Sequence, residues 1–168
     1  SDVLYILKNS REDNYSQDVD DNTYYTYKAI LNGTETKVKV EVSAVADGSA
    51  QGLYTDVVYS SNKYVDVVTP VTSANITSGL VDSDDFDVAT ITNKTLERKG
   101  DVLTTSDNSV SFYLADGAQA IVIKSNGDID TITSARSLAS SYKNTALTAT
   151  VYAVLNADGE ATTLYVQK

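Results

Sequence analysis

The strongest constraint on this chain is Asn32 followed by Gly33, a pair that separates two stretches of strand-forming residues. Asn and Gly tolerate the positive φ angles that both central residues of a type I′ turn require, and this turn matches the twist of a two-stranded hairpin. TYYTYKAIL precedes the pair and TETKVKVEV follows it, with Val38, Val40 and Val42 alternating with charged residues. Because strand side chains alternate between faces, this pattern predicts a hairpin with one buried and one solvated face.

Further turn signals recur between stretches rich in Val, Ile, Thr and Tyr. They lie at residues 60–63, 107–108, 126–127 and 156–159. β-branched and aromatic residues suit the half-buried surface of a sheet, and the chain has 12 Tyr but a single proline. Short strands separated by such turns at intervals of about 8–12 residues are typical of small sandwiches and barrels. We therefore predict an all-β fold.

Two features predict a division of this fold into two modules. Hairpins with the shared pattern A-[IV]-L-N begin at Ala29 and at Ala153, and the stretch TPVTSANITSG resembles a connector. We expect two small antiparallel barrel- or sandwich-like modules, residues 1–74 and 75–168, with the boundary somewhere within 69–85. The alternative is a single sandwich of about ten strands.

One short helix is expected in the second module, at residues 134–142. Ser134 has the side chain of a helix N-cap, because its hydroxyl can accept a hydrogen bond from a free backbone N–H of the first turn. Leu138 and Tyr142 lie four residues apart and would share one helical face.

Composition excludes several classes of function. The chain has no cysteine and no histidine, which removes disulfides, thiol catalysis, the commonest general base and the commonest transition-metal ligand. A net charge of −10 argues against nucleic acid as a partner, because phosphate-backbone binding needs clustered Lys and Arg. No stretch approaches the roughly 18 apolar residues of a membrane span, so we expect no membrane insertion. We read the chain, which begins at Ser1 without Met, as a piece of a longer protein.

No motif in the sequence carries a catalytic mechanism. Paired carboxylates can hydrolyse glycosides, but the acidic residues here lie in predicted turns or on polar strand faces rather than in apolar runs that would raise a pKa. No nucleophile motif of the G-x-S-x-G type occurs. We predict a protein that is not an enzyme and has no cofactor, and we assign no catalytic residues.

Three acidic clusters are the candidates for a metal site: DVDDN at 18–22, DSDDFD at 82–87 and NGDID at 126–130. Calcium takes six to eight oxygen ligands, which alternating Asp residues in a loop can supply in part. None of the clusters has the closing glutamate of an EF-hand. We expect solvated turns and no metal site, and the crowded Asp82, Asp84 and Asp85 make DSDDFD the first cluster to inspect.

Tyrosines are the candidates for a binding face. Six lie in the predicted strands of the first module: Tyr24, Tyr25, Tyr27, Tyr54, Tyr59 and Tyr64. Exposed aromatic rings can stack against sugars, whereas strand tyrosines more often cover the edge of a core with the hydroxyl in water. Solvent-facing rings would indicate a binding face, and rings packed against the core would indicate a structural role.

Three stretches resemble the repeated β-rich modules of large Gram-positive surface proteins, which often also carry S-layer homology segments. They are KGDVLTTSDNSVSFYLADGAQAIVI, GLYTDVVYSSNKYVDVV and ATVYAVLNADGEATTLYV. The recurring strands of those modules match residues 100–104, 114–123 and 158–166, and the wall-binding S-layer segment itself is not present. The resemblance implies an extracellular, non-catalytic module.

From these observations we expect a structural or spacer module of a bacterial cell-surface protein, located outside the cell, whose partners are other domains of the same protein. The alternative is an adhesin domain that binds a polysaccharide or a host protein through a tyrosine-lined face. The sequence assigns no ligand-binding residues for either role.

Overall fold

The computed structural model describes residues 2–45, 50–71, 86–92, 96–105, 107–141 and 150–168. The chain divides into two compact units, residues 1–71 and 72–168, hereafter unit 1 and unit 2. The predicted boundary between residues 74 and 75 lies outside the described residues. The described residues are nearly all β-strand, with one short helix, which confirms the predicted all-β fold. No helix among the described residues is long and apolar enough to cross a bilayer.

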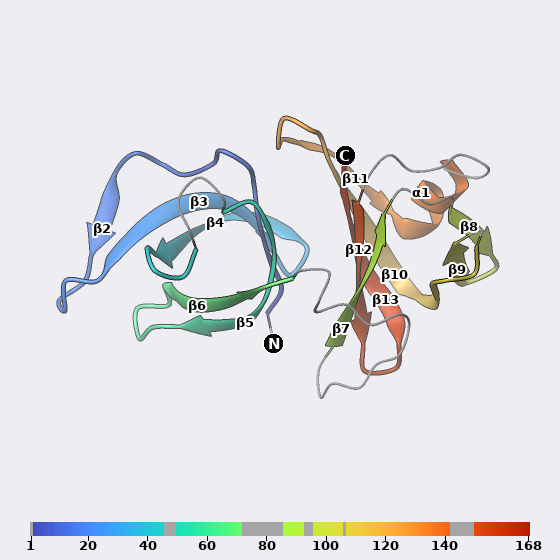
Figure 1. Ribbon diagram of the computed structural model, residues 1–168, viewed down its shortest axis with the longest axis horizontal. Helices are drawn as coiled ribbons and strands as arrows, with labels where there is room; N and C mark the ends of the chain where they lie inside the picture. Colours follow the sequence, from blue (N-terminus) through green and yellow to red (C-terminus); the bar gives the residue numbers. More distant parts are fainter. Residues whose placement is uncertain (1, 46–49, 72–85, 93–95, 106, 142–149) are drawn as a thin grey trace. The chain divides into compact units, whose positions relative to one another are not determined.

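Unit 1 is a closed barrel of five strands with one additional strand (Figure 1). Its strands are β1 (Leu4–Ile6), β2 (Tyr15–Gln17), β3 (Thr23–Leu31), β4 (Thr34–Glu41), β5 (Gly52–Tyr59) and β6 (Val65–Pro70). The hydrogen-bonded order is β1-β5-β6-β4-β3-β2, and β1 also pairs with β3. That second pairing of β1 closes the barrel. The additional strand, β2, pairs with the first three residues of β3.

The unit 1 core contains apolar side chains from all five barrel strands. Alternation along β3 sends Tyr27 and Ala29 into this core together with Leu4 and Ile6 of β1. Closure has one irregular point, because β4 and β6 run parallel and pair only at Val40 and Val65. The remaining pairings in unit 1 are antiparallel, as predicted.

The hairpin predicted at Asn32 and Gly33 is confirmed. Strands β3 and β4 pair without interruption from Tyr24 opposite Glu41 to Leu31 opposite Thr34. Asn32 has a φ of 49° and Gly33 a φ of 84°, both positive, as a type I′ turn requires.

Unit 2 is a curled sheet that forms half a barrel, with one short helix. Its elements are β7 (Phe86–Thr92), β8 (Leu96–Lys99), β9 (Val102–Thr105), β10 (Ser111–Ile123), β11 (Ile129–Ser134), α1 (Ala135–Ser141), β12 (Thr150–Asn156) and β13 (Glu160–Gln167). The order is β7-β12-β13-β10-β9-β8, and β11 also pairs with β10. The predicted antiparallel pairing holds except between β10 and β13, which are parallel.

The predicted helix is confirmed as α1, and it begins as expected. Ser134 accepts a hydrogen bond at Oγ from the backbone N–H of Ser137, at 3.1 Å, which is the N-cap geometry. Ala135 and Leu138 are buried in the unit 2 core. Tyr142, which was expected on the same face, lies outside the described residues.

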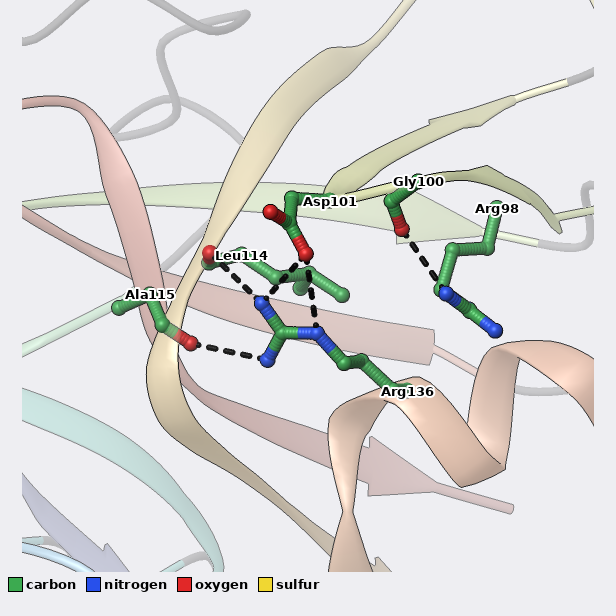
Figure 2. Close-up of polar contacts among 6 residues, drawn as sticks. All are labelled: Arg98, Gly100, Asp101, Leu114, Ala115 and Arg136. Carbon is green, nitrogen blue, oxygen red and sulfur yellow. Dashed lines mark hydrogen bonds and ion pairs between the residues drawn. The ribbon is translucent and has the colours of Figure 1, made fainter.

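A bulge in β10 is held by the arginine of α1 (Figure 2). Between Leu114 and Gln119, β10 has four residues, whereas the paired segment of β13 has one. Such a bulge leaves backbone groups without ladder partners. The Arg136 guanidinium donates to the carbonyls of Leu114, at 3.2 Å, and Ala115, at 3.1 Å, and also to Asp101 Oδ1, at 2.9 and 3.2 Å. Arg136 therefore fastens α1 to both β10 and the β8–β9 turn.

Candidate functional site

One type of turn recurs in both units, and two copies of it build the candidate site. The copies cover residues 18–22, 60–64, 124–128 and 156–160. In each, the N–H of the fourth residue donates to the carbonyl of the first, at 2.9 to 3.2 Å. The fourth residue also has positive φ: Asp21 62°, Lys63 67°, Gly127 97° and Gly159 78°. A turn followed by a left-handed residue is a common way to reverse a hairpin.

Turn 18–22 connects β2 to β3 and is organised by Asp18. Its Oδ1 accepts from the backbone N–H groups of Asp20, at 2.9 Å, and Asn22, at 3.0 Å. Its Oδ2 accepts from the side-chain amide of Asn22 at 3.0 Å. This amide hydrogen bond is the largest cause of the lowered pKa of Asp18, so the carboxylate is ionised at neutral pH.

Turn 60–64 connects β5 to β6 and is organised by Ser60. The Oγ of Ser60 accepts from the N–H of Tyr64 at 3.2 Å, and the Ser60 N–H donates to the Tyr64 carbonyl at 2.8 Å. Lys63 takes the left-handed position that glycine usually occupies, which is uncommon for a residue with a Cβ.

The two turns lie at the same end of the barrel (Figure 1) and line an open hollow of about 630 Å³. This volume falls within the roughly 300–1,000 Å³ typical of small-molecule sites. Its described lining is almost entirely polar. The lining residues are Gln17, Asp18, Val19, Asp20, Asn22, Tyr24, Ser60, Ser61, Asn62 and Asp66.

Tyr24 lines the hollow and joins its two sides. Its ring is buried, with 1% of the residue exposed, and it packs edge-on against Tyr64 with ring centroids 4.8 Å apart. The hydroxyl donates to Asp66 Oδ1 at 2.8 Å and lies 3.4 Å from Asp18 Oδ2. Burial, together with the hydrogen bond to Asp66, raises the pKa of Tyr24 to about 12. The hydroxyl therefore stays protonated and remains a donor at neutral pH.

The hollow is acidic. Asp18, Asp20 and Asp66 line it, and none of its described lining residues is basic. Within the described ranges, no three Asp, Glu, His or Cys side chains are grouped closely enough to hold a metal ion.

Half of the tyrosines singled out in the sequence are buried. Tyr24, Tyr27 and Tyr54 are each less than a tenth exposed, and the Tyr54 hydroxyl donates to the carbonyl of Ala50 at 2.8 Å. Tyr59 is exposed, but its hydroxyl donates to Asp2.

Each of the two half-buried tyrosines has a cation of the same chain against one face of its ring, and the Lys39 ammonium also donates to the Tyr64 hydroxyl at 3.3 Å. The Arg11 guanidinium lies 4.3 Å from the ring centroid of Tyr25, and the Lys39 ammonium lies 4.9 Å from that of Tyr64. A ring face covered by a cation–π contact is not free to stack against a sugar. Tyr15, which is 58% exposed and lies edge-on to Tyr25, was not among the tyrosines expected to bind.

The three acidic clusters contribute unequally to the candidate site. Asp18 of DVDDN uses both carboxylate oxygens within its own turn. In NGDID, Asn126 accepts from the Asp128 N–H at 2.9 Å, and Asp130 lies 3.8 Å from Lys168. The three aspartates singled out in DSDDFD, at 82, 84 and 85, lie outside the described residues.

Sequence reasoning identified part of this site but not the hollow. DVDDN was considered only for metal and Tyr24 only for stacking, while Asp66 was not considered at all. The available signal was the pair of turns, but Asp21 and Lys63 occupy positions where a sequence search expects Gly or Asn. Asp66 is 42 residues from Tyr24, and no local pattern connects them.

Comparison of the chain with family models, with curated proteins and with solved structures gave no match. Function therefore has to be inferred from the geometry of the chain itself.

Proposed function

We propose that this chain is a non-catalytic structural module of a bacterial cell-surface protein, located outside the cell, that holds other domains of the same protein at a fixed separation. The burial of the tyrosines carries this proposal. Of the six that could have formed a binding face, three are buried and two have one ring face against Arg11 or Lys39. The resemblance to β-rich surface modules supports the same role.

The absence of cysteine allows a direct test of the spacer role. Because the chain has no cysteine, spin labels can be placed at Asp13→Cys in unit 1 and Asp158→Cys in unit 2, both exposed. A module that sets a fixed separation should give one narrow distance distribution between the two labels. The pair Asp13→Cys and Glu35→Cys, within unit 1, gives the reference width. A distribution between units as broad as that of a flexible linker would contradict the spacer role.

The proposed location is tested separately, on cells of the organism that encodes the chain. Antibodies raised against the purified chain should label intact cells as strongly as permeabilised cells. Labelling that requires permeabilisation would rule out the extracellular location and leave the distance measurement unaffected.

A binding role is the second candidate, and the hollow at the end of unit 1 favours it. The expected tyrosine platform does not support that role, because three of its six rings are buried and two have a cation of the same chain against them. The hollow offers a different basis, since polar groups from two separate turns converge on one space of about 630 Å³.

A further inference from the structure

The charge of the hollow limits which ligands it can accept. Three carboxylates, those of Asp18, Asp20 and Asp66, line it, and none of its described lining residues is basic. An anion such as a phosphate or a sulfated glycan would meet like charge with no opposite charge to compensate. The described acidic side chains are also not grouped as a metal site requires. A polar ligand without negative charge therefore fits the hollow.

The polar groups of the hollow suit hydroxyl-rich ligands in particular. Carboxylates accept hydrogen bonds at two adjacent oxygens, and side-chain amides both donate and accept, so both can bind neighbouring hydroxyls of one ligand. Asp66 uses Oδ1 to accept from Tyr24, and no hydrogen bond joins its Oδ2 to the described residues. The carboxylate of Asp20 and the amide nitrogen of Asn62 likewise make no hydrogen bond to the part of the chain that the structure describes.

The hollow is also organised before any ligand arrives. Asp18 fixes turn 18–22 through three hydrogen bonds, and Ser60 fixes turn 60–64. The Tyr24 hydroxyl, bonded to Asp66, connects the two sides. A ligand therefore orders few protein groups when it binds, which lowers the entropic cost.

One apolar side chain stands at the rim. Val19 is 98% exposed, at the tip of turn 18–22, and it lines the hollow. The C–H face of a sugar ring is apolar, so Val19 can cover it while the polar groups bind the hydroxyls. Removing that apolar surface from water would favour binding.

We propose that the hollow between turns 18–22 and 60–64 is a binding site for a neutral saccharide. The hydroxyls of the sugar are bound by Asp66, Asp20 and Asn62, and Val19 contacts its apolar face. This inference rests on the second candidate function, a binding role, and names its site and its ligand class.

The test is a nuclear magnetic resonance titration of the full chain, followed residue by residue. The probes are cellobiose, maltose and chitobiose as neutral saccharides, a sulfated heparin disaccharide as an anion, and calcium chloride. Each is added to about 20 mM, roughly twentyfold above a 1 mM dissociation constant. We expect at least one neutral saccharide to shift the amide signals of residues 17–24 and 60–66, and the heparin disaccharide and calcium to leave them unchanged.

Matched substitutions sharpen the result. Asp66→Asn keeps an acceptor for Tyr24 but removes the charge, and Asn62→Ala removes an exposed amide; each should weaken saccharide binding about tenfold. Asp128→Asn is the control, because Asp128 lies in the same type of turn, residues 124–128, in unit 2. It should leave the affinity unchanged.

Each other outcome overturns the proposal in an identifiable way. Shifts with calcium alone would make the hollow a cation site, and shifts with the heparin disaccharide alone would contradict the charge argument. Saccharide shifts elsewhere, for example around Tyr15, would keep a binding role but reject this site. No shift with any neutral saccharide would reject the site and leave the spacer role to the distance measurement.

Discussion

The two units solve the same problem, the exposed edges of a β-sheet, in different ways. In unit 1 the first strand, β1, pairs with β3 on one side and β5 on the other, so that five strands form a closed ring. In unit 2 the sheet curls but does not close among the described residues, and its order runs from β7 to β8. There α1 packs against β8, β10 and β11. Unit 1 is closed by backbone pairing, whereas in unit 2 a helix packs beside β8, one of the two end strands of the described sheet.

The two units differ in the groups that bind otherwise unpaired backbone N–H and C=O groups. Closure of a barrel satisfies the N–H and C=O groups of its edge strands directly. In unit 2 a side chain satisfies groups inside the sheet: Arg136 binds the carbonyls of Leu114 and Ala115 at the bulge of β10. Backbone pairing therefore closes the sheet of unit 1, and an arginine side chain satisfies the bulge of unit 2.

The two hairpins that share the A-[IV]-L-N pattern differ in what their asparagine side chains bind. Asn32 reaches out of its turn, accepting from the Val3 N–H and donating to Asp2 Oδ1, both at 2.8 Å. It thereby fastens the start of the closing strand. Asn156 stays within its turn, where it accepts from the N–H groups of Asp158 and Glu160 at 3.0 Å.

The largest expected loss of stability comes from shortening a core residue of β1 or β7. Ile6 is fully buried in a strand paired on both sides, and Ile91 is 2% exposed in a strand that ends the described sheet. Replacing a buried Ile by Ala costs roughly 2–5 kcal/mol, and less where the surroundings can collapse. We expect Ile6→Ala to fall in the upper half of that range and Ile91→Ala in the lower half. Native-state hydrogen exchange reads each unit separately, and equal losses would mean that closure adds no rigidity.

A smaller effect is expected from the arginine that fastens α1. Arg136→Ala leaves two bulge carbonyls and Asp101 without their donor, so we expect unit 2 to lose about 1.5–3 kcal/mol. Arg98 is the control, because it is exposed and donates to the carbonyl of Gly100 at 2.9 Å (Figure 2). Arg98→Ala should change stability by no more than about 0.5 kcal/mol. Urea unfolding followed by signals of α1 measures both, and a similar loss in the two variants would contradict the proposed role of Arg136.

The smallest expected effect is a pH dependence confined to unit 1. The hydroxyl of Tyr59, and then the amide of Asn32, lower the pKa of Asp2 below its usual 3.8. A lowered pKa in the folded state means that the ionised form stabilises the fold above pH 3.8. That stabilisation is lost as the pH falls through the lower folded-state value. Because Asp2 is partly exposed, we expect it to amount to less than about 1 kcal/mol.

Hydrogen exchange of β1 between pH 6 and about pH 2 tests this dependence. Asp2→Asn should remove part of the acid-induced loss of protection in β1 and leave β12 unchanged. Asp158→Asn, in the hairpin of unit 2, is the matched control and should not alter β1. If β1 of the Asp2→Asn variant loses protection on acidification as steeply as β1 of the original chain, ionised Asp2 does not stabilise the closing strand.

Local features of the fold could be predicted because they depend on neighbouring residues. Asn32 and Gly33 fix a turn through their own φ preferences, and the alternation after Gly33 turns Val38 and Val40 toward the core. Val42, expected on the same face, lies beyond the end of β4 and is 45% exposed. Ser134 was expected to cap α1 and does so. In each case the interacting groups lie within a few positions of one another, so the pattern is visible in the sequence.

Long-range features could not be predicted in this way. Nothing near β1 indicates that it pairs with both β3 and β5, and nothing in β10 indicates a parallel partner in β13. The hollow depends on Tyr24 and Asp66 meeting across 42 positions of the chain. The sequence by itself determined most of the strands and turns and the helix, because backbone preferences and side-chain alternation are local. Only the tertiary structure decided barrel closure, the bulge that Arg136 holds and the acidic hollow, because these depend on which distant strands pair and in which register.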